Sequence, residues 1–477
     1  MKFRIENLGR LDRAELEVAD LTVICGENNS GKTYATYALY GFLRMWAQSS
    51  MAPHPMALHA ANALPQTGVH RIDLLKDLLP TAKSYFDEMS KLYNKQLVKV
   101  FASREDYFND SSIHFTPDEV EPDFSAEFKH AVKIGAHPAL IFSKEADSTH
   151  LEITRPSGLD KAIPPYAVAN LIDDVFRQLL WNKMVPSVHI SSTERTGAAV
   201  FHRSLNFSRD KALDALVQME SKRQQHDSEA FVTQLFLDHR SDYPLPVEDN
   251  VKLLGNLEQL SKTTGKIAAT HPKILSAFDE IVGGAYKSTK EGVYYIPKGS
   301  KNKLTMAEAS SVVRSLLDFS FYLRHVLKPG DLLIMDEPEM SLHPKNQRLL
   351  TRLLARLVNA GVRIFITTHS DYIIRELNSL IVMKSLGERF AEKRKSLSYD
   401  EEELLTASGV HVYTACNIKE KGAKKALHCL EEREVDPAFG MGIDSFDDQI
   451  EKLNELQEML IQATSEEESS DANYLFS

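Results

Sequence analysis

The stretch GENNSGKTY at residues 26–34 decides the fold of this chain. Gly26, Gly31, Lys32 and Thr33 satisfy the pattern G-x-x-x-x-G-K-[ST], in which successive backbone N–H groups and the start of a helix surround a phosphate group. The glycines let the backbone turn tightly and approach an anion closely. In such a loop the lysine neutralises the outer phosphate oxygens, and the threonine hydroxyl holds Mg²⁺. The stretch therefore predicts a nucleotide-binding loop.

The residues on either side give the loop the context that this role requires. LTVIC (21–25) is an apolar run that reads as a buried strand, and YATYALYGFLRMW (34–46) has apolar residues at helical spacing. A strand, a loop and a helix in this order place the phosphate at a helix N-terminus. The residues expected to contact the nucleotide are Gly26, Glu27, Asn28, Asn29, Ser30, Gly31, Lys32 and Thr33.

Two further apolar strands end in residues that suit nucleotide hydrolysis. In LLIMDEPEMSLHP (332–344), Asp336 is placed to hold Mg²⁺ and Glu337 to polarise an attacking water. Alone, this stretch is also compatible with an ordinary strand and a charged turn. IFITTHSDYI (364–373) carries His369 at its end, where an imidazole could sense the γ-phosphate or orient water. The expected catalytic residues are Lys32, Glu337 and His369, and the expected metal ligands are Thr33 and Asp336.

Composition and charge limit the classes of protein to be considered. The 477 residues are 43% hydrophobic and 26% charged, which is ordinary for a soluble protein of two or three subdomains. A formal net charge of −11 argues against a surface that binds nucleic acid everywhere. Basic stretches at 287–292, 297–303 and 419–425 could form a local strip, or could be solvated loops and helix faces. Three cysteines without metal-ligand spacing, no signal-peptide pattern and no long apolar run predict a cytoplasmic location and no membrane association.

The order of the expected elements indicates an α/β fold with a long insertion. From residue 304 onward, strands alternate with helices such as 308–327, as in a largely parallel sheet. Residues 205–282 read as helical. The predicted divisions are an N-terminal lobe at 1–50, a mixed, largely helical insertion at 51–285 that includes the strand and loop at 186–200, a C-terminal lobe at 286–415, a helical region at 416–463 and a disordered acidic tail at 464–477.

The order of these motifs resembles the ABC-type ATPase head, within the branch that contains SMC proteins, RecF and the OLD-family ATPases. The wording DEPExxLHP, here DEPEMSLHP (336–344), is typical of RecF- and OLD-like members. The resemblance covers residues 1–45 and 300–385, and it implies an ABC-type P-loop ATPase head with a mainly helical insertion, which takes ATP and Mg²⁺. It assigns a Walker A role to 26–33, Walker B to Asp336 and Glu337, a D-loop to 341–344 and an H-loop to His369.

Two departures from that family pattern concern the remaining motifs. The transporter signature LSGGQ is absent, and MAEASSVVRSLLDF (306–319) stands in its place, with Ser310 and Ser311 opening a helix. Two hydroxyls at a helix start suit a γ-phosphate that arrives from another subunit, so we read them as a degenerate signature and as nucleotide contacts. Simple helix capping explains the same spacing. No glutamine can be assigned to a Q-loop.

The stretch HISSTERTG (189–197) resembles an ERTG-type loop in ATPases of the bacterial anti-phage systems Septu (PtuA) and PARIS (AriA). Glu194 and Arg195 stand at the end of an expected strand, where they could contact nucleotide or a partner. A plain surface loop is an equally good interpretation, so neither residue is assigned a catalytic role.

Several functional classes are disfavoured by the rest of the chain. No sustained heptads occur between residues 46 and 300, as the arms of a chromosome-scale SMC protein would require. A transporter ATPase would carry a smaller insertion and another signature. The nearest string to the guanine-reading N-K-x-D is NKMV at 182–185, which lacks the acid, so ATP is favoured. DSFDDQ (444–449) reads as a helix cap rather than part of a fused nuclease.

Two functional hypotheses remain. In the first, the protein is an ATP-hydrolysing, nucleotide-switched oligomeric scaffold or sensor in an anti-phage defence complex with an effector nuclease encoded nearby. In the second, it is a RecF-like repair or recombination ATPase that clamps DNA directly. Both require at least a dimer, because the helix at Ser310 and Ser311 would complete the site of a second copy. The acidic net charge and the lack of a recognisable nuclease module favour the first hypothesis.

Overall fold

The computed structural model describes residues 1–47, 52–119, 121–134, 137–156, 164–202, 243–419, 426–442, 452 and 454–460. Four of the stretches singled out above lie wholly or mostly outside the described residues. They are most of the expected helical stretch before residue 243, most of the basic stretch 419–425, the acidic stretch 444–449 and the expected tail at 464–477.

A nine-stranded sheet forms the centre of the molecule, in the order β5-β1-β2-β16-β15-β3-β14-β13-β9. The strands that carry the nucleotide-binding motifs are parallel neighbours, as expected for strands joined by helices. Because their carboxyl ends meet at one edge, the residues that follow them converge there. These strands are β3 (Leu21–Cys25), β14 (Arg363–Thr368), β13 (Leu332–Asp336) and β9 (Val188–Ser191), and β15 (Val410–Ile418) runs parallel to β3 on its other side.

The other part of the sheet is mainly antiparallel. It contains β1 (Lys2–Leu8), β2 (Leu11–Glu17), β5 (Ser112–Thr116) and β16 (Leu427–Arg433). The expectation of a helical region from residue 416 is wrong for its first part, because β16 pairs with β15 and a short hairpin of β17 (Val435–Asp436) and β18 (Gly440–Met441) follows. Cross-strand burial of Cys429 and Leu430 outweighs the helix propensity of the charged residues around them. Residues 454–460 are helical.

Alternate residues of the central strands enter two separate apolar cores. In β13, Leu332 and Ile334 belong to one core, whereas Leu333 and Met335 belong to the other. The first core contains α1 (Lys32–Ala47) and the insertion up to β9, and the second contains the last part of the insertion and the helices on the opposite face. Those helices are α14 (Leu317–His325), α15 (Pro344–Asn359) and α16 (Asp371–Leu386). The predicted α/β fold is thereby confirmed as a central sheet with helices on both faces.

At the edge strand β9, a side chain forms the backbone hydrogen bonds that another strand would otherwise form. The Asn250 amide, on α9 (Leu245–Gly255), donates to the Ile190 carbonyl at 2.6 Å and accepts from the Ser192 N–H at 3.0 Å. Asn250 is buried, so these bonds replace the strand partner that the backbone would otherwise lack. The strand that was expected within the insertion is therefore the outer strand of the central sheet.

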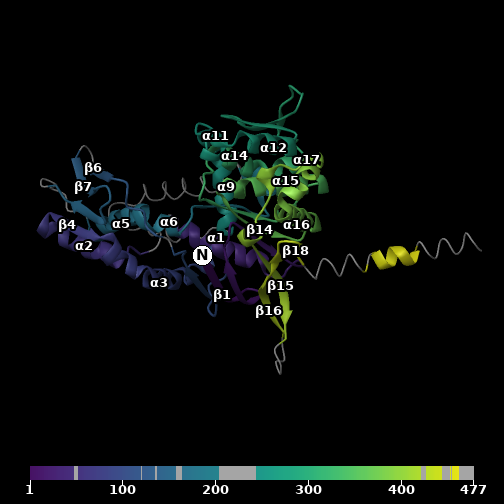
Figure 1. The fold of residues 1–477 in the computed structure, drawn as a ribbon. Coiled ribbons are helices and arrows are strands. Elements are labelled where there is room, and N and C mark those ends of the chain that lie inside the picture. The colour runs from purple at the N-terminus through teal and green to yellow at the C-terminus, as the bar shows by residue number, and fades with distance from the viewer. Residues whose placement is uncertain are drawn as a thin grey trace, which may run out of the picture.

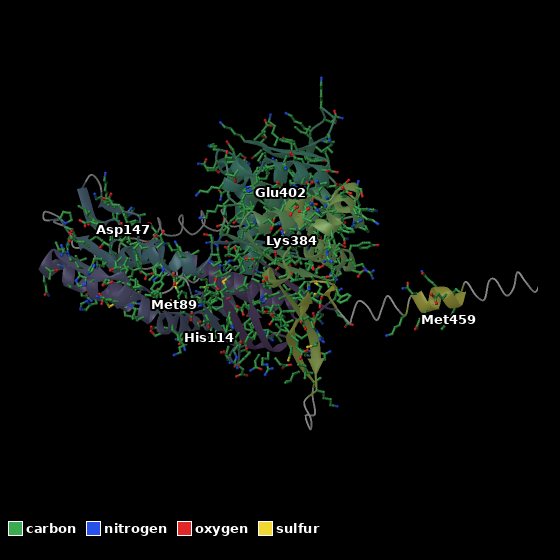
Figure 2. The ribbon with its side chains drawn as sticks, in the orientation of Figure 1. Met89, His114, Asp147, Lys384, Glu402 and Met459 are labelled. Atoms are coloured by element: carbon green, nitrogen blue, oxygen red, sulfur yellow. The ribbon has the colours of Figure 1, made fainter. Side chains whose placement is uncertain are left out.

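The first part of the insertion forms a lobe to one side of the sheet, drawn in purple-blue and blue in Figure 1. Its helices include α2 (Pro55–Thr67), α3 (Ala82–Asn94) and α5 (Pro165–Phe176). They are accompanied by an antiparallel sheet of β4 (Val69–Asp73), β8 (His150–Thr154), β7 (His137–Lys144) and β6 (Phe128–Ile134), in that order. Figure 2 shows Met89 and Asp147 on this lobe, away from Lys384 and Glu402 on the main body.

Between the insertion and β13 the chain forms a three-stranded sheet and a broken helix. The sheet contains β10 (Gly284–Thr289), β11 (Gly292–Pro297) and β12 (Leu304–Thr305) and follows α12 (Pro272–Val282). The single helix expected at 308–327 is two helices, α13 (Ser311–Ser315) and α14, because Leu316 leaves helical geometry at φ −106° and ψ 5°. Within the described residues, no helix is long and apolar enough to span a membrane.

Candidate functional site

The loop at residues 26–33 turns from the end of β3 into the start of α1, as predicted. Gly26 and Gly31 have φ values of 140° and 95°, which other residues rarely adopt. A Cβ atom at Gly26 would lie 2.8 Å from Cβ of Ala415, and one at Gly31 would lie 2.6 Å from Cγ of Leu11. Both glycines are therefore required by conformation and by space, which leaves the backbone N–H groups of the loop free to form a phosphate cradle.

Lys32 is buried at the base of this loop. Its ammonium donates to the carbonyls of Gly26 at 2.9 Å and Glu27 at 2.8 Å. Burial lowers the pKa of Lys32, and the carboxylates of Glu337, Asp336 and Glu339, in that order of strength, oppose this. The cation thus faces an acidic edge of the sheet and is positioned to neutralise phosphate oxygens between itself and those acids. This arrangement fits a nucleoside triphosphate.

Asp336 ends β13 and is completely buried. One carboxylate oxygen accepts from the Thr367 hydroxyl on the neighbouring strand β14. The other, Oδ2, has no hydrogen-bond partner among the described residues. Burial raises the pKa of Asp336 to about 6, with the Thr367 bond acting in the opposite direction. A buried carboxylate oxygen without a partner is the kind of ligand that Mg²⁺ takes, so the residues present fit the expected metal.

Glu337 follows immediately and has a left-handed backbone, with φ 51°. Its N–H donates to both the carbonyl and the hydroxyl of Thr367, at 3.2 and 3.1 Å, and this pairing holds the unusual conformation in place. The turn directs the carboxylate of Glu337 to within 3.6 Å of Nδ1 of His369. Structure therefore brings Lys32, Asp336, Glu337 and His369 to one edge, as the sequence predicts for strand ends.

A third acid, Glu339, belongs to the same cluster although sequence reasoning gave it no role. It is buried, and its Oε1 accepts from the Thr368 hydroxyl at 2.9 Å and from the His369 N–H at 2.8 Å. Nδ1 of His369 lies 3.3 Å from the same oxygen. Burial raises the pKa of Glu339. The residue joins the turn after β13 to the turn after β14, and the third acid of the DEPE string (336–339) is the sequence feature that marks it.

Arg195 is one of the two residues whose role the sequence left open, the other being Glu194. Its side chain is 1% exposed and contacts only backbone carbonyls of the site. Nη1 donates to Ser192 at 2.9 Å and Asp336 at 2.7 Å, and Nη2 donates to Glu337 at 2.6 Å. Nε donates to the Ser315 carbonyl of α13 at 3.1 Å. One guanidinium therefore fixes the backbone of both acids and ties it to α13; it is not a surface loop residue.

Glu194, the other uncertain residue, is exposed and points toward α1. Its carboxylate accepts from the Tyr37 hydroxyl at 2.8 Å, and its charge contributes to the raised pKa of Asp336 after burial and Glu337. Tyr37 lies one helical turn beyond Thr33, the expected metal ligand. Glu194 thus lies shortly after β9 and contacts α1 one turn beyond Thr33.

Ser310 and Ser311 open α13 but occupy a different place from the loop at 26–33. Ser310 is the N-cap residue, is exposed, and makes no side-chain capping bond, so its hydroxyl is not used to cap its own helix. Within the described part of the chain, neither serine is hydrogen-bonded to the loop. Their link to the site in the same chain runs through Ser315 and Arg195. The two serines are thereby available to a ligand held by another molecule.

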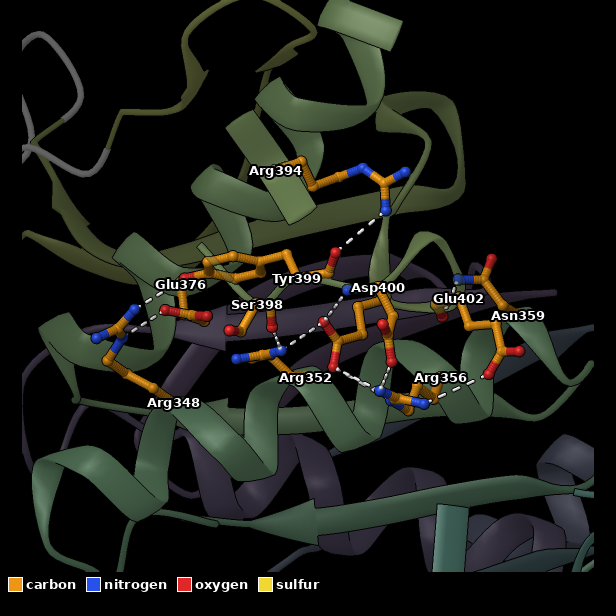
Figure 3. Close-up of polar contacts among 11 residues, drawn as sticks. Arg348, Arg352, Arg356, Asn359, Glu376, Arg394, Ser398, Tyr399, Asp400 and Glu402 are labelled. Atoms are coloured by element: carbon orange, nitrogen blue, oxygen red, sulfur yellow. Dashed lines mark hydrogen bonds and ion pairs between the residues drawn. The ribbon is translucent and has the colours of Figure 1, made fainter. Parts of the chain in front are cut away.

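The helices that follow β13 and β14, namely α15 and α16, are joined by side-chain contacts, and Figure 3 shows those made by α15. Arg352 and Arg356 both contact the Glu403 carboxylate, which is almost fully buried. Arg348 contacts Glu376 on α16 at 2.6 Å. At the end nearer the site, the Ser370 hydroxyl donates to Gln347. The predicted D-loop and H-loop segments therefore lead into one connected structure.

Comparison with known proteins finds matches to both parts of this site. Residues 1–154 match the family model described as AAA ATPase domain, and residues 193–375 match the one described as AAA domain, putative AbiEii toxin, Type IV TA system. The Nod factor export ATP-binding protein I of Cupriavidus metallidurans is 27% identical over 161 residues, which are 34% of this chain and 46% of that protein. The chain therefore spans about half the length of this curated relative.

Solved SMC head structures align over most of the chain at low similarity. An SMC head bound to the C-terminal winged-helix domain of ScpA is 9% identical with a TM-score of 0.34, and covers 92% of this chain and 98% of its own. The SMC head domain from Thermotoga maritima is 10% identical with a TM-score of 0.29, and the alignment covers 91% and 98%. The loop at residues 26–33 lies in the segment that resembles one AAA ATPase family model, and the acids after β13 lie in the segment that resembles the other.

Proposed function

We propose that the chain binds ATP with Mg²⁺ and hydrolyses the nucleotide in a site that two copies complete together. The observation that carries this proposal is the convergence of a buried ammonium, Lys32, and a buried, partly unpartnered carboxylate, Asp336, at the edge where the glycine loop meets α1. The unpartnered oxygen of Asp336 suits a metal ion, and the lysine at the helix N-terminus suits the phosphates that such an ion accompanies.

The residues divide the chemistry between them. Lys32 and the backbone of the loop hold the phosphates, and Thr33 and Asp336 hold the metal, which would screen the charge that develops on the phosphate oxygens. Glu337, turned outward by its left-handed backbone, accepts a proton from the attacking water. His369 stays within reach of that carboxylate and positions it. Arg195 and Glu339 keep the turns that carry these groups fixed.

The second half of each site comes from another copy, in this proposal. Ser310 is exposed, and its hydroxyl makes no capping bond, so it can close over a γ-phosphate that the partner holds. Nucleotide state then sets how the copies are arranged, which makes the protein a switch. We assign it to an anti-phage defence complex with an effector nuclease, on the resemblance of HISSTERTG (189–197) to the ERTG-type loop of anti-phage ATPases and on the toxin–antitoxin description of the family model that matches residues 193–375.

Direct clamping of DNA, as in RecF-like proteins, is the second candidate. The observation in its favour is a group of exposed lysines on the three-stranded sheet before α13, in a chain that is otherwise acidic. Affinity for duplex DNA well below micromolar at physiological salt, without any partner, would favour this candidate over the scaffold.

A Glu337→Gln variant tests the proposed reaction. It should bind ATP like the wild type, but its turnover rate should be at least about 100-fold lower, because only the proton acceptor is removed. The measurement is the nucleotide that stays bound after gel filtration, which should be ATP in the variant and ADP in the wild type. Lys32→Ala is the companion variant and should weaken ATP binding by about 10- to 100-fold in calorimetry, whereas Lys384→Ala, an exposed lysine on α16, should not. Wild-type turnover by Glu337→Gln would refute the assigned base.

A further inference from the structure

Helix α9 contacts two elements of the proposed ATP site through neighbouring side chains. The Asp249 carboxylate accepts from the Tyr40 hydroxyl at 2.7 Å and from Nε of Arg44 at 2.8 Å, and both partners lie on α1. Asn250, the next residue, makes the two hydrogen bonds described above to the end of β9. Because α1 begins at the phosphate-binding loop and β9 leads to Arg195, α9 joins two parts of the site. Figure 1 shows α9 next to α1 in the main body.

The contacts among α1, α9 and the turn after β9 form a closed ring. On its third side, the Glu194 carboxylate in that turn accepts from the Tyr37 hydroxyl of α1 at 2.8 Å. Tyr37 and Tyr40 are three residues apart and therefore lie on the same face of α1. Each of the three elements is thus held by the other two, so a shift of one strains the hydrogen bonds to both.

The Asn250 side of the ring leads directly to the acids of the site. Its Oδ1 accepts from the Ser192 N–H, and the Ser192 carbonyl accepts from the Arg195 N–H at 3.2 Å and from its Nη1 at 2.9 Å. Arg195 in turn donates to the carbonyls of Asp336 and Glu337. Asn250, Ser192 and Arg195 are buried, so water cannot replace these bonds. Three hydrogen bonds in series therefore connect α9 to Glu337.

We propose that Asn250 is a positioning residue for ATP turnover, which sets the place of the Arg195 turn and, through it, the direction of the Glu337 carboxylate. This inference rests on the proposed function, because it takes Glu337 as the proton acceptor. A reacting group that is displaced by about 1 Å can lose about 100-fold in rate. Neither hydrogen bond of the Asn250 carboxamide reaches the loop at residues 26–33. Loss of Asn250 should therefore lower kcat and leave the affinity for ATP unchanged.

The other edge of the same sheet offers a matched control. There the carboxamide of Asn94, at the end of α3, donates to the Ile113 carbonyl at 3.2 Å and accepts from the Ile113 N–H at 2.9 Å. Asn94 thus caps the edge strand β5 with the same pair of bonds that Asn250 forms at β9, and these strands are the two ends of the strand order. If capping an edge were the whole role of Asn250, loss of either asparagine would leave kcat of the folded protein unchanged.

Asn250→Ala and Asn94→Ala are compared with the wild type in steady-state ATP turnover, ATP-binding calorimetry and thermal unfolding. Asn250→Ala should lower kcat at least about 10-fold and change the Kd for ATP less than about 2-fold. Asn94→Ala should lower the unfolding temperature by a similar amount but keep kcat within about 2-fold of wild type. Asn250→Asp has the same size and keeps an acceptor for the Ser192 N–H but loses the donor to Ile190, so it should lower kcat by only about 2- to 5-fold.

Hydrogen exchange of the nucleotide-free protein gives a readout that does not depend on turnover. Asn250→Ala should raise amide exchange at least about 10-fold across residues 190–196, whereas Asn94→Ala should do so only across residues 112–116. Unchanged exchange at 190–196, or an equal loss of kcat in the two alanine variants, would overturn the assignment. If Asn250→Ala does not fold, wild-type kcat in Asn250→Asp would overturn it instead. A wild type that binds ATP without turning it over would refute the proposed reaction, while the exchange still decides whether Asn250 holds the turn of Arg195.

Discussion

At the scale of single residues, Arg195 holds together more of the site than any predicted catalytic residue. Its guanidinium occupies the space between the end of β9, the turn after β13 and α13, and it donates to a backbone carbonyl of each of these elements. A planar donor group of this width can reach carbonyls on three elements at once, whereas a lysine can reach only one or two. The residue positions the two acids without touching substrate.

Arg195→Met and Arg195→Lys should therefore affect turnover more than binding. The methionine variant removes the buried hydrogen bonds of the guanidinium and should lower the free energy of unfolding by about 3 kcal/mol, with kcat reduced at least about 10-fold. Lysine should restore most of the stability but not kcat, because it cannot span Asp336 and Ser315. The KM for ATP should stay within about 2-fold, since the loop at 26–33 is untouched. Thermal unfolding and steady-state kinetics measure both effects, and a lysine variant with wild-type kcat would contradict the role.

At the scale of elements, the sequence predicts what is decided locally. The strand–loop–helix at 21–47 and the apolar runs of β13 and β14 are recognisable because burial on both faces demands continuous apolar residues. The place of β16 in the sheet was not recognisable, because one of its two neighbouring strands, β2, lies hundreds of residues earlier in the chain. Arg195 was left open for the same reason: its partners are backbone carbonyls, which leave no trace in the sequence.

The start of α2 in the insertion lobe depends on an uncharged histidine. His54 is the N-cap residue, and its Nδ1 accepts from the Met56 N–H at 3.1 Å while Nε2 lies 2.9 Å from the Thr81 hydroxyl. Burial lowers the pKa of His54 to about 4 from an ordinary value of 6.5. Protonation would require Nδ1 to give up its acceptor role. As the pH falls, His54 is therefore protonated in the unfolded chain at a higher pH than in the folded chain.

Acid should therefore destabilise the insertion lobe in a defined window. Between pH 6.5 and pH 4 the unfolded chain carries a proton on His54 that the folded chain does not, so stability should fall as the pH falls, by up to about 3 kcal/mol. Replacement of His54 by asparagine, which can also cap a helix, should flatten the dependence in this window. Chemical denaturation at several pH values measures it. If the free energy of unfolding depends on pH equally with and without the histidine, other groups are responsible for the loss of stability.

At the scale of the whole molecule, the proposed ATP site is divided twice. Within one chain, the N-terminal loop and the C-terminal acids are separated by the insertion and are reunited by the parallel order β3-β14-β13-β9. Between chains, the helix that begins at Ser310 is expected to serve the partner's loop. Arg195 connects the two divisions, because it bonds the acids of one site and the helix that would complete the other. The second division yields a direct test.

Mixing two inactive variants should restore activity if the sites are shared. Lys32→Ala disables the half-site that holds the phosphates, and Ser310→Arg blocks the half-site offered to the partner; the serine is exposed and caps nothing, so its replacement should not disturb folding. In an equal mixture half of the dimers are mixed, and each has one intact site of two, so ATP turnover should recover to about a quarter of wild type. The matched control mixes Lys32→Ala with Glu337→Gln. Both defects then lie on the half-site that belongs to the loop, so no intact site forms and no recovery is expected. If the first mixture stays as inactive as the second while tagged copies exchange, each chain completes its own site and the shared-site proposal fails.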